Sequence, residues 1–170
     1  MRAVAVLAAG LAASGAGAPT TIRLPVPVIR QTPERCGPAA LAMVLRFYGA
    51  DSAALAEAER AYDPVLKGSL ITDLAAAARR GGWNAVVAEA PEDSLRAWLA
   101  RGVPPILLYR RGISALSVGH YGVVVGWDAG RQRYAVNDGG AETRTVARHD
   151  LMRRWRAAGS LALILAQPDR

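Results

Sequence analysis

The chain contains a single cysteine, Cys36, and a cysteine can act as a nucleophile when it is held as a thiolate. Cys36 stands directly before an apolar segment with helical spacing. The unpaired N–H groups at a helix start would favour the thiolate and could also donate to an oxyanion. Arg35 would add to this effect if its guanidinium pointed the same way. The alternative interpretation is a small, buried and inert thiol at the start of a helix.

A nucleophilic thiol needs a base, and the chain offers two histidines, His120 and His149. His120 opens an expected strand over 120–128, where the start of a strand beside a cleft would present the imidazole. His149 lies among charged residues at the start of an expected helix, where a solvated or capping role fits better. We therefore expect His120 to be the general base.

A third group should orient the imidazole. The expected strands over 120–128 and 133–138 are joined by a short turn and should pair as a hairpin, which brings Asp138 beside His120. Asn137 would point to the opposite face of a regular strand. Asp128 lies at the turn end of the hairpin, remote from His120. Asp138 is therefore the expected orienting residue.

Gln31 completes the candidate set. It lies five residues before Cys36, and Pro33 bends the chain between them. A side-chain amide can donate a hydrogen bond to a developing oxyanion, so Gln31 is the expected oxyanion donor. The alternative is that Gln31 is an ordinary polar residue of a surface loop.

The elements that must position these residues follow from periodicity and turn signals. The segment 19–35 is rich in proline and β-branched residues and is expected to form an extended arm. Helices are expected over 37–48, 52–62, 91–102 and 147–159, and over 68–82 with Ser69 or Thr72 as the cap. Strands are expected over 83–89, 104–110, 120–128, 133–138, 143–146 and 160–166. A helical first half followed by a mostly antiparallel sheet predicts a two-lobed α+β domain.

Composition narrows the classes of function. The formal net charge is +7, but the chain has one phenylalanine and no stripe of aromatic residues interleaved with Arg or Lys, so we expect no nucleic-acid partner. One cysteine and two histidines are too few for a closed structural zinc site. We therefore expect no metal and no cofactor. A basic anion-binding protein is an alternative that rests on the net charge alone.

The first eighteen residues have the pattern of a secretory signal peptide: an early arginine, an apolar stretch and then small residues. Cleavage after Ala16 fits better than cleavage after Ala18, because Pro19 follows the latter. The stretch is too short to span a bilayer. We expect a signal peptide over 1–18, a single domain over 19–170, and a periplasmic or extracellular location, the alternative being a disordered Ala/Gly-rich N-terminus. An exported chain with one unpaired cysteine has either an intermolecular disulfide or a working thiol.

Three segments together resemble the C39 cysteine peptidases, the bacteriocin-processing, double-glycine peptidases: QTPERCGPAALAMVLRFYG, GHYGVVVGWD and YAVNDG. The resemblance covers about residues 24–140. It implies a papain-like fold with an N-terminal helical lobe and a C-terminal antiparallel sheet, and cleavage of leader peptides after a Gly-Gly pair. Carried over to this sequence, it implies Cys36 as nucleophile, His120 as general base and acid, Asp138 as orienting residue and Gln31 as oxyanion donor.

The sequence departs from the family pattern in three places. Arg35 stands where the family often has Asp, Gln31 lies five rather than six residues before the cysteine, and Gly139 follows Asp138 where a proline is common. The best-known members are N-terminal domains of ATP-driven exporters, whereas this chain resembles a free-standing exported relative. We expect a peptide or protein substrate, with association with a separate exporter or the cell envelope left open. The alternatives are a catalytically silent peptide-binding module and an acyl transferase or amidase on the same fold.

Overall fold

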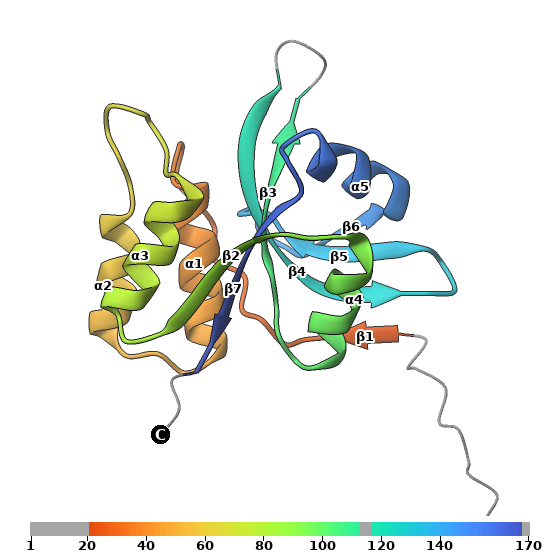
Figure 1. The fold of residues 1–170 in the computed structure, drawn as a ribbon, viewed down its shortest axis with the longest axis horizontal. Helices are drawn as coiled ribbons and strands as arrows, with labels where there is room; N and C mark the ends of the chain where they lie inside the picture. Colours follow the sequence, from red (N-terminus) through yellow and green to blue (C-terminus); the bar gives the residue numbers. More distant parts are fainter. Residues whose placement is uncertain (1–20, 113–116, 168–170) are drawn as a thin grey trace, which may run out of the picture.

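The computed structural model describes residues 21–112 and 117–167 of the chain. In this part, one group of helices packs on one side of an antiparallel sheet and a second group packs on the other side (Figure 1). The expected signal peptide over 1–18 lies outside the described residues. Among the described helices, none is both long enough and apolar enough to cross a membrane.

The helix α1 (Cys36–Phe47) begins at the cysteine itself, one residue earlier than the sequence pattern suggested. Pro38 is its third residue, where the missing N–H needs no partner within the helix. Leu41 and Leu45 are fully buried on the face toward the sheet. The helix ends before Gly49, whose positive φ of 77° is a conformation that glycine adopts without strain.

Two more helices pack beside α1. The helix α2 (Ser52–Arg60) is capped by Asp51, whose carboxylate accepts a hydrogen bond from the Ala54 N–H at 2.9 Å. The helix α3 (Ile71–Arg80) has Leu70 at its cap position and no side-chain cap, so the expected capping by Ser69 or Thr72 is wrong. Ser69 packs instead against the start of α1.

The sheet contains β2 (Asn84–Glu89), β3 (Ile106–Arg111), β4 (Val118–Asp128), β5 (Arg133–Asn137), β6 (Arg144–Ala147) and β7 (Leu161–Ala166). Their order is β2-β7-β3-β4-β5-β6, and all neighbours are antiparallel. The expected hairpin β4–β5 is present, and β5 and β6 form a second hairpin. The strand β2 follows α3 near the middle of the chain and pairs with the late strand β7, so segments far apart in the sequence share one sheet.

The N-terminal arm is extended as expected and also supplies a strand, β1 (Thr21–Arg23), that the sequence pattern did not reveal. This strand pairs with the end of β4, with Thr21 opposite Asp128. The arm then follows the sheet, and the Gln31 N–H donates to the Gly139 carbonyl at 3.0 Å. The arm therefore brings Gln31 to the chain segment that directly follows β5.

Hydrophobic side chains fix β4 from both faces. Val123 and Val125 belong to the core beneath α1 and α3, whereas Val124 belongs to the core beneath α4 (Glu92–Ala100) and α5 (Arg148–Arg156). Successive side chains of a strand alternate between faces, so one apolar run serves both cores. All three valines are almost completely buried, and burial of such a side chain is worth roughly 1.5–3 kcal/mol. The strand that carries His120 is therefore held rigidly.

Candidate active site

Cys36 is the first residue of α1, and its side chain is half-buried. It lines a cavity of about 810 Å³ together with His120 from β4 and Gln31 from the N-terminal arm. The first turn of α1 contains no acidic residue that would oppose a thiolate. The structure thus gathers three of the four predicted site residues around one cavity.

The Arg35 guanidinium is directed elsewhere. It lies 4.2 Å from the centre of the Tyr62 ring and donates to the Glu59 carboxylate at 3.0 Å. Its charge is therefore used in a cation–π contact and an ion pair on the helical lobe. The guanidinium is therefore not directed at Cys36, and the condition under which Arg35 would assist the thiol is not met.

His120 is the third residue of β4 rather than the first residue of its strand, and only 5% of it is exposed. It lies opposite Tyr109 of β3, with the two rings in edge contact and their centres 5.4 Å apart. Its Nε2 lies 3.0 Å from the backbone carbonyl oxygen of Asp138. A carbonyl oxygen can only accept, so this contact, the shorter of the two at Nε2, is a hydrogen bond in the tautomer that carries its proton on Nε2 and keeps the lone pair of a general base on Nδ1. In that tautomer the Arg111 guanidinium cannot donate to the ring and acts through its charge alone.

The charge state of His120 depends on its surroundings. Burial lowers the pKa of the imidazole, and the hydrogen bond to the Asp138 carbonyl opposes this effect. The Arg111 guanidinium, 3.3 Å from Nε2, lowers the pKa further because a second positive charge disfavours the imidazolium. The neutral imidazole is therefore the favoured form of His120, and this is the form that can accept a proton from a thiol.

Asp138 directly follows β5 and is 94% buried, but its carboxylate makes no hydrogen bond with His120. The carboxylate accepts a hydrogen bond from Arg144 of β6 at 2.8 Å, and the ring of His120 is held by the Asp138 main-chain carbonyl. The hairpin thus brings Asp138 beside His120 as predicted. The contact is made by the main-chain carbonyl of Asp138 and not by its side-chain carboxylate.

Gly139 explains one departure from the family pattern. Its φ of 81° is far from the value near −65° to which a proline ring is restricted. A Cβ at this position would also lie 2.5 Å from the Gln31 Cδ. The Gln31 side chain packs directly on Gly139, and its Oε1 is buried without a hydrogen-bond partner among the described residues. Only glycine satisfies both the backbone conformation and the space.

The less favoured candidates lie elsewhere. His149 is exposed on α5, 3.5 Å from the Asp150 carboxylate. Asn137 is fully buried and joins the arm to the sheet, since its amide donates to the Val26 carbonyl at 3.1 Å. Asp128 accepts hydrogen bonds from Arg131 at the turn between β4 and β5. None of the three lines the cavity that contains Cys36.

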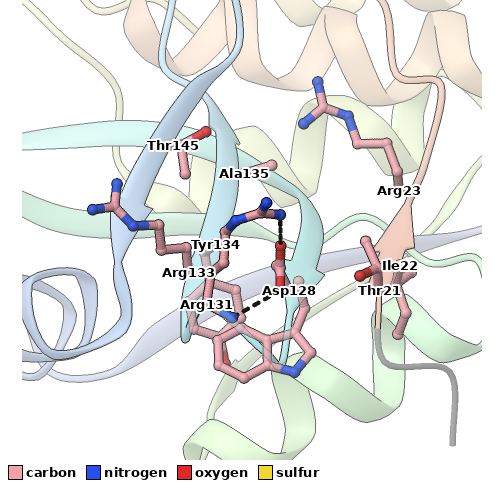
Figure 2. Close-up of a pocket in the computed structure, with 10 residues that line it drawn as sticks. Thr21, Ile22, Arg23, Asp128, Arg131, Arg133, Tyr134, Ala135 and Thr145 are labelled. Carbon is pink, nitrogen blue, oxygen red and sulfur yellow. Dashed lines mark hydrogen bonds and ion pairs between the residues drawn. The ribbon is translucent and has the colours of Figure 1, made fainter.

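Figure 2 shows a second cavity, of about 340 Å³, beside Asp128 and the strand β1. Arg131 is engaged by Asp128 there, and Arg23 and Arg133 complete the basic lining. The lining contains no thiol and no imidazole, so this cavity cannot support the chemistry predicted for Cys36. The described residues also contain no cluster of three or more His, Cys, Asp or Glu side chains that could hold a metal ion.

Sequence reasoning missed two tightly packed residues of the cavity wall, Ser69 and Tyr121. The Tyr121 hydroxyl donates to the Ser69 carbonyl at 3.0 Å, which ties β4 to the loop before α3. The Ser69 hydroxyl is buried without a partner among the described residues, and a Cβ at Gly37 would lie 3.0 Å from it. Tyr121 could have been suspected because it directly follows His120, whereas the sequence pattern suggested only a helix-capping role for Ser69.

A cysteine at the start of a helix and a histidine of an antiparallel sheet that line one cavity are typical of papain-like cysteine peptidases, and the mixed architecture agrees with this class. The model of the Peptidase_C39 like family matches residues 23–163. The chain therefore belongs to this family of cysteine peptidases, as the sequence resemblance predicted. None of the curated proteins matches the chain.

Solved structures share the fold. A double glycine motif protease from an AMS/PCAT transporter, in complex with the leader peptide, has a TM-score of 0.67 at 23% identity, covering 86% of this chain and 94% of its own. The peptidase domain of Streptococcus ComA, a bi-functional ABC transporter involved in a quorum sensing pathway, has a TM-score of 0.66 at 22% identity, covering 84% and 99%. A C39-like peptidase from Bacillus anthracis has a TM-score of 0.70 at 16% identity, covering 88% and 99%.

Proposed function

We propose that the chain hydrolyses peptide bonds by nucleophilic catalysis with Cys36, His120 and Asp138. The observation that carries this proposal is that Cys36 and His120 line one cavity although they lie 84 positions apart, one on a helix and one on a strand. The Nε2 atom of His120 is held at the same time by the Asp138 carbonyl. A nucleophile, a base and an orienting group in this order form the constellation that activates a thiol.

In the proposed reaction, Nδ1 of His120 accepts the Cys36 proton and the thiolate attacks the scissile carbonyl carbon. The resulting oxyanion accepts hydrogen bonds from the Cys36 backbone N–H and the Gln31 side-chain amide. The imidazolium then gives its proton to the leaving amine, so that a thioester remains on Cys36. Water, activated by the same imidazole, hydrolyses the thioester and restores the thiol.

Asp138 acts in this scheme through two atoms. Its carbonyl oxygen accepts the Nε2–H bond and keeps the ring in the productive tautomer. Its carboxylate, which neutralises Arg144, supplies a negative charge that favours the imidazolium during catalysis. We therefore assign the orienting function to the main chain of Asp138 and an electrostatic function to its side chain.

The cavity suits an extended peptide rather than a small molecule. Its rim carries exposed apolar side chains, namely Leu66 and Leu70 before α3 and Val118 at the start of β4. Exposed apolar groups around a cleft are typical of binding sites for apolar side chains of a partner. The similarity to a double glycine motif protease that was solved with a leader peptide supports cleavage after a Gly-Gly pair.

The proposal includes export of the mature domain and a separate exporter or the cell envelope as its partner. It is supported by the signal-peptide pattern of residues 1–18 and by the similarity to peptidase domains of transporters. N-terminal sequencing of the protein recovered from a secreting host tests this point. A mature N-terminus near residue 17 supports export, and an intact Met1 in the cytoplasm contradicts it.

The decisive experiment incubates the protein with a peptide library that contains Gly-Gly sites and identifies the products by mass spectrometry in ¹⁸O-labelled water. We expect single cleavages after Gly-Gly with one labelled oxygen in the new carboxylate, and no cleavage by Cys36→Ala. Cleavage that persists in Cys36→Ala would refute the thiol mechanism. Products joined to an added amine instead of water would identify an acyl transferase, and binding without any product would identify a silent binding module.

A further inference from the structure

A separate cavity of about 270 Å³ lies between the β5–β6 hairpin and α5. Asp138 lines it, but neither Cys36 nor His120 does. Three arginines from different elements contribute to its wall: Arg133 from β5, Arg144 from β6 and Arg154 from α5. The cavity therefore adjoins the proposed catalytic residues while it remains distinct from the proposed substrate site.

The positive charges of this cavity are only partly neutralised. The Asp138 carboxylate pairs with Arg144 at 2.8 Å. Asp150, the other acidic residue of the wall, pairs at 2.8 Å with Arg153, which lies outside the cavity lining. Arg133 and Arg154 have no ion pair with any residue that the structure describes. Figure 2 shows the Arg133 side chain extending away from the Asp128–Arg131 pair.

Tyr109 adds a second feature that points to a ligand. It lines the cavity, it is 95% buried, and its hydroxyl makes no hydrogen bond with a described residue. The hydroxyl oxygen is not fully enclosed, so it can donate a hydrogen bond to a group that enters the cavity. Burial raises the pKa of the Tyr109 hydroxyl, and the negative charge of Asp138 raises it further, so the hydroxyl remains a proton donor. A donor hydroxyl in one cavity with two guanidinium groups that have no ion pair among the described residues is an arrangement suited to an anion.

We propose that this cavity binds a small oxyanion, such as inorganic phosphate or a small carboxylate, between Arg133, Arg144 and Arg154. The volume is near the lower end for ligand sites, which suits an anion of this size. Planar guanidinium groups bind carboxylate and phosphate oxygens through paired hydrogen bonds. The anion and the Asp138 carboxylate then compete for Arg144.

This competition links the anion site to the active site. Asp138 carries both the carboxylate that pairs with Arg144 and the carbonyl that holds His120. An anion on Arg144 therefore changes the charge balance around Asp138 without entering the cavity of Cys36. Anion binding does not depend on peptidase activity, so its measurement stands even where the proposed function fails.

The test measures binding of inorganic phosphate and of citrate to the full chain by isothermal titration calorimetry at constant ionic strength. We expect saturable one-to-one binding that weakens at least tenfold in Arg154→Gln. Arg156→Gln is the matched control, because Arg156 is exposed on the same helix and does not line the cavity. Its affinity should remain within twofold of the unsubstituted chain. Arg133→Gln, at an exposed position, serves as the second cavity variant if Arg154→Gln does not fold.

Asp138→Asn tests the competition for Arg144. Removal of the competing carboxylate should tighten binding of the same anion about fivefold or more, whereas a merely structural role of Asp138 would leave the affinity unchanged or weaker. Equal weakening in Arg154→Gln and Arg156→Gln would show general attraction to a chain of net charge +7 and overturn the site. Binding that does not saturate, or that Asp138→Asn does not tighten, would also overturn the proposal.

Discussion

Gly139 is the residue at which the N-terminal arm, the end of β5 and the proposed site meet, so its replacement by alanine tests the geometry directly. The positive φ of 81° costs a non-glycine residue about 1–2 kcal/mol. The new Cβ would also overlap the buried Gln31 side chain, and overpacking of this kind costs about 1–3 kcal/mol. We expect Gly139→Ala to lower the free energy of unfolding by about 2–5 kcal/mol.

Two glycines of the same chain separate the two contributions. Gly49 has a φ of 77° and open space around its Cβ position, so Gly49→Ala should show the conformational cost alone, about 1–2 kcal/mol. Gly140 is exposed, lies outside the positive-φ set, and has ordinary contact distances, so Gly140→Ala should be nearly neutral. The double variant Gln31→Ala/Gly139→Ala removes the overlap and should retain only the conformational cost of Gly139→Ala.

The assay is chemical denaturation of these variants followed by tryptophan fluorescence, with thermal unfolding as a second measurement. For a chain of this size, each 1 kcal/mol shifts the unfolding temperature by roughly 2–4 °C. If Gly139→Ala costs no more than Gly49→Ala, or if Gln31→Ala relieves none of its cost, then Gln31 does not pack on Gly139 as described. The placement of Gln31 beside the active site would then be wrong.

Four further predictions concern the catalytic residues. His120→Ala should slow alkylation of Cys36 by iodoacetamide at neutral pH about tenfold or more, because the thiol loses its base. His149→Ala, at an exposed position, should leave the alkylation rate unchanged. Equal effects of the two substitutions would contradict the assignment of His120 as the general base. Asp138→Asn should lower kcat about tenfold with little change in KM, because the main-chain carbonyl of residue 138 still holds the His120 ring while the negative charge of the side chain is lost. An unchanged kcat would show that the Asp138 side chain has no part in the mechanism. The lowered pKa of His120 should place the acid limb of the pH profile of kcat/KM below an ordinary histidine pKa of about 6.5. Arg111→Gln removes a nearby positive charge and thereby raises the pKa of His120, so the acid limb should move to higher pH. Because the unfolded chain takes up this proton before the folded chain does, stability should fall as pH drops through about 6.5 and below, and His120→Ala should weaken that pH dependence. A limb that stays in place in Arg111→Gln would show that this charge does not act on His120.

The sequence was sufficient to predict the elements and the pairing of the central hairpin, because both depend on local periodicity and turn residues. The apolar run of 123–125 and the turn after Asp128 led directly to β4 and β5. The short strand β1 was missed because three residues carry too little periodicity, and its pairing depends on an edge of β4 that only the folded sheet exposes. The start of β4 was placed two residues late for a similar reason, since Val118 and Gly119 are exposed and show no alternation.

The atom of Asp138 that meets His120 could not be predicted, because three distant features decide it together. A bulge between Val124 and Gly126 sets the register of β4 against β5, so that Asn137 lies opposite Val123 and Asp138 falls just beyond the last pair. The positive φ of Gly139 then turns the chain, and the arm fixes that turn through the Gln31 N–H.

With the turn fixed in this way, the Asp138 carbonyl faces His120, and the carboxylate is left to Arg144. The expected hairpin supplied the right residue, but only the register, the turn and the arm together select the main chain as the group that orients the imidazole. This distinction matters chemically, since a carbonyl fixes the tautomer without adding a full negative charge to the ring. The charge of the Asp138 side chain is then balanced separately by Arg144, and the anion proposed to compete for Arg144 would weaken that balance.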